Sequence, residues 1–138
     1  MLRSHHHLRG FVKLVLWDVY CVNGCGSDVY KLKCPDCNKA YVGQTGRSFQ
    51  VRFNEHINAF KSNSHTSNFV KHLNEQAHSF GSIHNTMQIL KRQNKRSPVN
   101  TIERFYIYAE YLNNNHLNDD HTIFPSTIFE ALLKHHQP

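Results

Sequence analysis

The chain has 138 residues and a formal net charge of +6, from 16 lysines and arginines against 10 aspartates and glutamates. This length fits one domain, and a core this small gains from a metal or another cross-link. No apolar run is long enough to cross a bilayer, which argues against a membrane protein. The positive charge suits a polyanionic partner, because each lysine or arginine that docks on a phosphate releases counterions.

Composition divides the chain into three parts. We expect residues 1–26 to form a leader without an assigned role, residues 27–125 to form the folded domain, and residues 126–138 to form a C-terminal tail. All four cysteines lie among the first 37 residues, and the chain has 12 histidines. Clustered cysteines followed by histidines are more typical of a zinc site in a reducing compartment than of a disulfide framework.

A β-hairpin is the first regular element that we expect. Residues 29–32 alternate like a short strand, residues 34–38 are rich in turn-forming types, and residues 39–43 suggest a second strand. The short connection predicts that the two strands pair antiparallel.

Two helices are predicted to follow the hairpin. Ser48 can cap the first helix, and residues 63–67 end it. Thr66 or Ser67 can cap the second helix. Both have an apolar face at helical spacing. The first face consists of Phe49, Phe53, Ile57 and Phe60, and the second of Phe69, Val70 and Leu73.

A third strand over residues 87–90 and a long helix complete the predicted fold. The helix begins at residues 97–98, with Pro98 in its first turn. Strand, strand, helix, helix, strand and helix predict a small α+β domain, a three-stranded antiparallel sheet flanked by helices. The inward stripe of the long helix is Val99, Ile102, Phe105, Tyr106, Ala109 and Leu112.

Several polar residues stand out against this framework. Tyr30 and Tyr41 belong to the two hairpin strands, where ordinary sheet packing is the plainest explanation for a tyrosine. Arg52 and His56 are four residues apart and share one face of the first helix, which could also be a solvated polar face. Glu103 lies between inward residues of the long helix.

Cys34 and Cys37 form a Cys-x2-Cys turn inside the hairpin loop, and His72 and His78 follow with five residues between them. Together they offer four sulfur and nitrogen ligands of the structural-zinc type. Free thiols and surface histidines are the alternative interpretation. The two cysteines of the leader could also compete as ligands.

These motifs resemble the GIY-YIG nuclease superfamily, and specifically the endonuclease domain of Penelope-like retroelements. The resemblance covers about residues 30–125, and Asp28 stands where the first motif usually has glycine. It is supported by Val29-Tyr30-Lys31-Leu32-Lys33-Cys34, Cys37, Tyr41-Val42-Gly43-Gln44-Thr45, Arg52-Phe53-Asn54-Glu55-His56, Lys71-His72 with His78, and Ile102-Glu103.

The resemblance implies a metal-dependent DNA endonuclease, a hydrolase that nicks target DNA. Glu103 would hold catalytic Mg²⁺ or Mn²⁺, and Zn²⁺ on Cys34, Cys37, His72 and His78 would be structural. The implied catalytic set is Tyr30, Tyr41, Arg52, His56, Glu103 and Asn118.

Individual roles follow from the same resemblance. Arg52 would support the transition state. Tyr30 or Tyr41, or a metal-bound water aided by His56, could take the proton of the attacking water, and the resemblance favours Tyr30 as this base. A phenol has an ordinary pKa of about 10, so we expect the site to lower it through Arg52 or the metal. Asn118 is the best match for the family's asparagine, with residues 113–115 as competitors, and His65 lies where several members have a histidine.

DNA in the nucleus is the implied partner, with a reverse transcriptase of the parent element as a further one. Because the chain has no room for that enzyme, we expect a fragment of an element or a separated nuclease. The alternative is a catalytically inactive, zinc-stabilised DNA-binding remnant, against which the complete set of polar residues argues. A repair-type GIY-YIG nuclease is a third interpretation, which the Cys-x2-Cys insertion disfavours.

Overall fold

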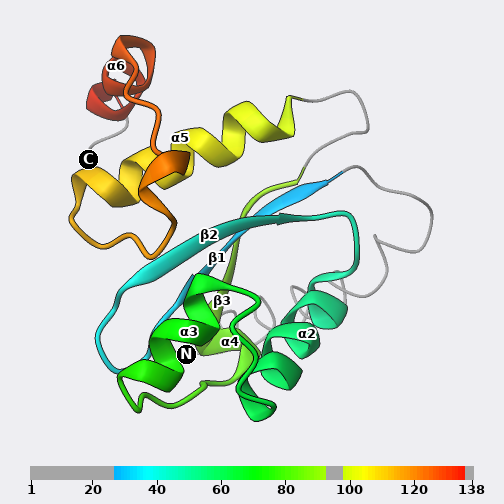
Figure 1. Cartoon of the computed structure of the whole chain (residues 1–138). Helices are drawn as coiled ribbons and strands as arrows, with labels where there is room; N and C mark the ends of the chain where they lie inside the picture. The colour runs from blue at the N-terminus through cyan, green and yellow to red at the C-terminus, as the bar shows by residue number, and fades with distance from the viewer. Residues whose placement is uncertain (1–26, 93–97, 136–138) are drawn as a thin grey trace, which may run out of the picture.

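Figure 1 shows the computed structural model of the chain, which describes residues 27–92 and 98–135. Its centre is a three-stranded antiparallel sheet with the strand order β2-β1-β3. The strands are β1 (Asp28–Lys33), β2 (Ala40–Thr45) and β3 (Met87–Lys91). The predicted α+β class and the antiparallel hairpin are confirmed. The predicted leader, residues 1–26, lies outside the described residues.

Helices cover both faces of this sheet (Figure 1). The first helices after the hairpin pack on one face, and the long helix α5 packs on the other. No helix of the described ranges is long and apolar enough to span a bilayer. The helices are α2 (Phe49–Lys61), α3 (Asn68–Glu75), α4 (Ile83–Thr86), α5 (Val99–Leu112) and α6 (Thr127–His135), with a 3-10 turn η1 (Asp120–Thr122).

The central strand β1 is buried on both faces because its side chains alternate between them. Tyr30 and Leu32 pack with the apolar residues of α2 and α3. Val29 points to the opposite face, where Val42 of β2 and Ile107 of α5 complete a second cluster. The sheet therefore separates two small cores, and any site that uses both helical layers must form at a sheet edge.

The predicted caps and apolar faces of the first two helices are confirmed. Ser48 Oγ accepts a hydrogen bond from the backbone N–H of Val51 at 3.2 Å, and Ser67 Oγ accepts one from Val70 at 3.3 Å. Ser67, rather than Thr66, is therefore the second cap. The predicted inward residues of both helices lie in or against the first core, apart from Val70, which is also completely buried.

The predicted stripe of α5 is correct at the sheet and wrong at its end. Leu112 is 51% exposed, whereas Ile107, which the stripe did not include, is buried. Phe105 and Tyr108 face α6 instead, with ring centroids 5.5 and 6.3 Å from that of Phe129. The helix thus has a second apolar partner, which a single-stripe pattern does not anticipate.

The start of α5 and the predicted C-terminal tail differ slightly from expectation. Pro98 is the cap residue and not part of the first turn, since the helix begins at Val99. The predicted tail, residues 126–138, contains α6, which packs on α5. Tyr108 Oη donates a hydrogen bond to Glu130 Oε1 at 2.9 Å across this contact.

Candidate functional site

The hydroxyl of Tyr30 is the centre of a buried polar cluster. It accepts a hydrogen bond from Arg52 Nε at 2.9 Å and lies 2.9 Å from His56 Nε2. Arg52 and His56 are one turn apart on α2 and share one face of this helix, as predicted, and that face meets Tyr30 of the hairpin. Tyr30 itself has no exposed surface.

His56 connects this cluster to the start of α3. Burial, followed by the positive charge of Arg52, lowers the pKa of His56 to about 4, so the ring is neutral at pH 7. Its Nδ1 lies 3.2 Å from Oγ of Ser67, the cap of α3. A neutral ring has one donor and one acceptor nitrogen. Because Arg52 already donates to Tyr30, the consistent arrangement is Tyr30 donating to Nε2 and Nδ1 donating to Ser67.

The phenol of Tyr30 does not have the lowered pKa that we expected. Burial raises its pKa, and the neighbouring Tyr41 raises it further. Arg52 acts in the predicted direction, but burial outweighs it, so Tyr30 keeps its proton at neutral pH. Burial also raises the pKa of Tyr41.

Arg52 is held from its other side by Glu55. Arg52 Nη1 donates to Glu55 Oε2 at 2.7 Å, and Arg47 also donates to this carboxylate. The side chain of Arg52 is 31% exposed, so its guanidinium reaches the surface while its Nε is bound to Tyr30. The hydrogen bond from Arg52 is the first cause of the lowered pKa of Glu55.

Glu103 reaches the site from the α5 layer, on the opposite face of the sheet from Arg52 and His56. Gln44 of β2 donates through Nε2 to Glu103 Oε2 at 3.0 Å and to Asn100 Oδ1 at 2.8 Å. Burial raises the pKa of Glu103, although the bond from Gln44 opposes this. The charge of Glu103 also raises the pKa of both tyrosines, Tyr30 and Tyr41, so it lies within their electrostatic reach.

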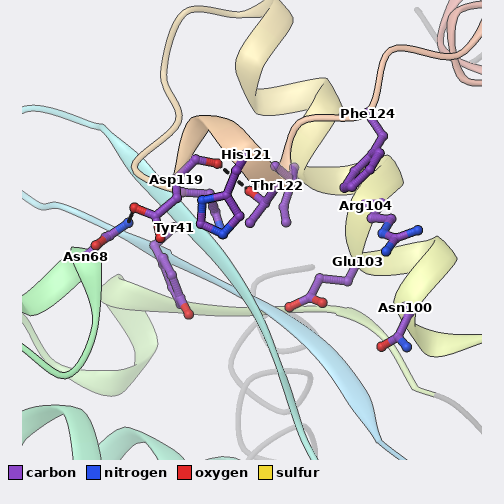
Figure 2. A pocket seen from close by; sticks show the side chains of 11 residues that line it. Tyr41, Asn68, Asn100, Glu103, Arg104, Asp119, His121, Thr122 and Phe124 are labelled. Atoms are coloured by element: carbon purple, nitrogen blue, oxygen red, sulfur yellow. Dashed lines mark hydrogen bonds between the residues drawn. The ribbon is translucent and has the colours of Figure 1, made fainter.

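A pocket of about 430 Å³ opens between α5 and the segment 118–124, at the edge of β2. Figure 2 shows Tyr41 on one side of it and Glu103 on the other. Tyr41, rather than Tyr30, is therefore the phenol that a bound molecule could touch.

Asn118 covers the edge of β2. Its Oδ1 accepts from the backbone N–H of Val42 at 2.9 Å, and its Nδ2 donates to the carbonyl of Val42 at 2.8 Å. The backbone of Ala40 is covered in the same way. Its carbonyl accepts a hydrogen bond from Leu117 N–H, and its N–H donates to the carbonyl of Asn115. The side chain of Asn118 thus acts as one more rung beside β2, and this fixes the segment that walls the pocket. His65 is exposed in the loop between α2 and α3.

The four predicted zinc ligands lie together at the other end of the hairpin. Cys34 Sγ is 3.3 Å from His78 Nδ1, Cys37 Sγ is 3.2 Å from His72 Nε2, and the two nitrogens are 3.3 Å apart. Zinc bond lengths of about 2.0–2.3 Å give tetrahedral edges of about 3.3–3.8 Å. All four ligand atoms lie within 4.8 Å of one another, a spacing compatible with a structural zinc site.

Local backbone geometry aims these ligands. Ala77 has a positive φ of 53°, a conformation that costs a residue with a Cβ about 1–2 kcal/mol. This turn ends α3 and lets the N–H of His78 donate to the carbonyl of Leu73 at 2.9 Å. Burial lowers the pKa of His72, which favours the neutral ring that binds metals.

Comparisons with protein-family models, with curated proteins and with solved structures give no match to this chain. Four residues that the sequence did not assign to the site hold its geometry together: Gly43, Gln44, Glu55 and Ser67. Ser67 was predicted only as a helix cap, and the other three stand in the motifs of the resemblance without an assigned role. Their roles depend on contacts that only the folded protein shows, with Tyr30 for Gly43, Glu103 for Gln44 and Arg52 for Glu55.

Gly43 provides the first test, because it lies directly opposite Tyr30 in the sheet. A Cβ at Gly43 would lie 2.8 Å from Tyr30 Oη and 3.0 Å from Tyr41 Cε1. We expect Gly43→Ala to lower the free energy of unfolding by about 1–3 kcal/mol, as overpacking does. Gly46→Ala is the control, since its Cβ would meet nothing nearer than Ser27 Oγ at 3.9 Å. Equal urea-unfolding midpoints for the two variants would contradict the close approach.

The neutral state of His56 predicts a dependence of stability on pH. In the unfolded chain, the His56 imidazole takes up a proton as the pH falls below 6.5. In the folded protein, it stays neutral until the pH falls to about 4. The contribution of neutral His56 to the free energy of unfolding is therefore complete above pH 6.5. It is lost as the pH falls to 4, and this loss is about 3 kcal/mol. We expect the stability advantage of wild type over His56→Asn to shrink by this amount between pH 7 and pH 4. Urea unfolding at several pH values measures it, and parallel curves would rule it out.

Proposed function

We propose that this protein is a metal-dependent DNA endonuclease of the GIY-YIG type, akin to the nuclease domains of Penelope-like retroelements. The observation that carries the proposal is the Tyr30 hydroxyl, bound at once by Arg52 and His56. Glu103 and Tyr41 flank the adjoining pocket. These five residues come from four separate elements, and they are five of the six catalytic residues that the resemblance implies.

Arg52 is the residue best suited to meet a phosphate. A guanidinium has five N–H donors in one plane, of which Nε binds Tyr30 and one on Nη1 binds Glu55. The remaining donors are held in a fixed orientation at the surface, as stabilisation of a developing negative charge requires. Tyr30 and His56 act through Arg52 as positioning residues, because neither has a surface that substrate could reach.

Tyr41 is better placed than Tyr30 to contact the attacking water. It lines the pocket that Glu103 also lines, whereas Tyr30 is completely buried. This assignment changes the role that the resemblance implied for Tyr30. Asn118 is likewise a positioning residue, because both ends of its amide are bound to β2.

Glu103 fits a hard divalent cation such as Mg²⁺ or Mn²⁺. Its carboxylate is partly buried and its pKa is raised, so a nearby cation would offset the cost of its charge. Among residues 27–92 and 98–135, the group of Cys34, Cys37, His72 and His78 is the only one that brings three or more His, Cys, Asp or Glu side chains together. A metal at Glu103 would hence complete its shell with water and phosphate oxygens, as Mg²⁺ does readily. When bound, it would polarise the phosphate and activate a water.

We further propose that the Cys34, Cys37, His72 and His78 group holds Zn²⁺ for stability and not for chemistry. Thiolates and imidazoles suit zinc, and four protein ligands leave no open position for substrate. The partner would be DNA in the nucleus, beside a reverse transcriptase if the domain belongs to a complete element. Asp28 does not oppose DNA at the surface, because it is only 3% exposed.

A DNA-binding remnant without catalysis is the second candidate function. The observation that favours it is the fully buried, protonated Tyr30, which cannot serve as a base in this arrangement. The two candidates differ in whether supercoiled plasmid is nicked when Mg²⁺ or Mn²⁺ is added.

Glu103→Gln provides the test of catalysis. We expect plasmid nicking to fall by about two orders of magnitude or more, the scale of losing an electrostatic contact in the transition state. DNA binding should persist or tighten, because one negative charge is removed. Glu75→Gln is the control, since Glu75 is exposed and pairs only weakly with Lys71 at 3.9 Å. Nicking by Glu103→Gln at the wild-type rate would refute the metal assignment.

The zinc proposal is tested by composition and stability together. Purified protein should contain about one zinc per chain, and Cys34→Ser/Cys37→Ser should lose it. Each kcal/mol of unfolding free energy that this variant loses with its zinc should lower the melting temperature by about 4–8 °C, the scale for a domain near 100 residues. Cys21→Ser/Cys25→Ser is the matched control and should keep both zinc and melting temperature. Zinc lost from the control instead, with none lost from the first variant, would assign the ligands to the leader.

A further inference from the structure

The pocket beside Glu103 extends well past the residues that phosphodiester cleavage would use. From Glu103 its lining continues along α5 to Arg104 and then to Phe124, which lies beside Arg104 in Figure 2. Its volume of about 430 Å³ lies within the range of about 300–1,000 Å³ typical of small-ligand pockets. A single phosphate group would leave most of this space unfilled.

Away from the metal proposed at Glu103, the lining chemistry does not suit a phosphate. Besides Glu103 it includes Asp119, and only Arg104 and His121 are basic. Carboxylates repel phosphates, but they accept hydrogen bonds from the amino groups of bases. Asn68 and Asn100 also line the pocket. Asn68 Nδ2 donates to Asp119 Oδ1 at 2.7 Å and Asn100 Oδ1 accepts from Gln44, so Asn68 Oδ1 and Asn100 Nδ2 are the amide atoms that would meet a base edge.

The far end of the pocket has the features of a stacking platform. Phe124 is 44% exposed, an unusual exposure for a large aromatic side chain. The guanidinium of Arg104 lies over the Phe124 ring, 4.2 Å from its centroid. Arginine planes and aromatic rings are the two groups on which proteins stack unpaired bases.

We propose that this pocket binds one unpaired base of the DNA strand, stacked on the Phe124–Arg104 pair beside the bond that is cut. The inference rests on the proposed function and narrows its substrate to DNA with an unpaired nucleotide at the cleavage site. A base inside a duplex is stacked between its neighbours, so it cannot enter a pocket in this way. Asn68 and Asn100 would contact the edge of the base.

Binding of two labelled DNA duplexes tests the proposal, one fully paired and one with a single unpaired nucleotide. Anisotropy is measured on the zinc-containing full chain without added Mg²⁺, so that no strand is cut. Wild type should bind the duplex with the unpaired nucleotide more tightly. Phe124→Ala should weaken this binding by about 5- to 150-fold, the range for loss of one stacked base, and leave the paired duplex unaffected.

Two further variants separate stacking from loss of apolar surface. Phe124→Tyr keeps a ring and should bind like wild type. Leu132→Ala removes an apolar side chain of the same 44% exposure from α6, outside the pocket, and should also bind like wild type. Melting temperatures verify that each variant is folded. Equal weakening on both duplexes by Phe124→Ala, or no weakening on either, would overturn the proposal.

The same duplexes with Mg²⁺ distinguish this inference from the proposed function. If wild type prefers the unpaired nucleotide but cuts neither DNA, the base pocket stands and the nuclease assignment fails. If it cuts both DNAs equally and binds them equally, the nuclease assignment stands and the base pocket is wrong.

Discussion

Tyr30 and Gly43 face each other across the β1–β2 ladder, and the space above Gly43 is what lets the phenol lie across the sheet. The phenol thereby reaches α2, where it binds one residue from each of two successive turns. A larger residue at position 43 would push the hydroxyl away from both partners. Because β1 is buried on both faces, the strand has no room to shift and restore these bonds.

Helix α3 connects the polar cluster around Tyr30 to the Cys/His group. Ser67 is both the cap of α3 and the partner of His56 Nδ1, so the start of this helix is fixed by the buried histidine. One turn further, His72 of the same helix faces Cys37 of the hairpin loop. The loop between Tyr30 and Tyr41 is therefore held at its tip by potential metal ligands and at its base by the polar cluster. A metal on the four ligands would act on the tyrosines only through this helix and loop, and so through their order.

Sequence predicted what depends on local pattern. The hairpin, the Ser48 cap and a cap of α3 at one of two candidate residues follow from short-range spacing, and the structure confirms them. The Cys-x2-Cys and His-x5-His pairs are also local patterns, and the structure brings their four side chains together. The pKa of Tyr30 was not predictable, because it depends on how completely α2 and α3 cover the phenol. The approach of Glu103 from the opposite helical layer was not predictable either, because the periodicity of a helix does not say which face of the sheet the helix will cover. The exposure of Leu112 belongs to the same class, because α6 offered α5 a second partner.

The edge of β2 explains how two helical layers can serve one site although the sheet separates them. An edge strand has backbone groups without a partner, and β2 satisfies those of Ala40 with the segment 115–117 and those of Val42 with Asn118. This covering ends at Val42, and the next outward residue on the α5 side is Gln44, whose side chain binds Glu103. Tyr41 points to the α2 side of the same strand and still lines the pocket. The edge of β2 therefore lets a carboxylate from one layer and a phenol from the other flank the same bound molecule.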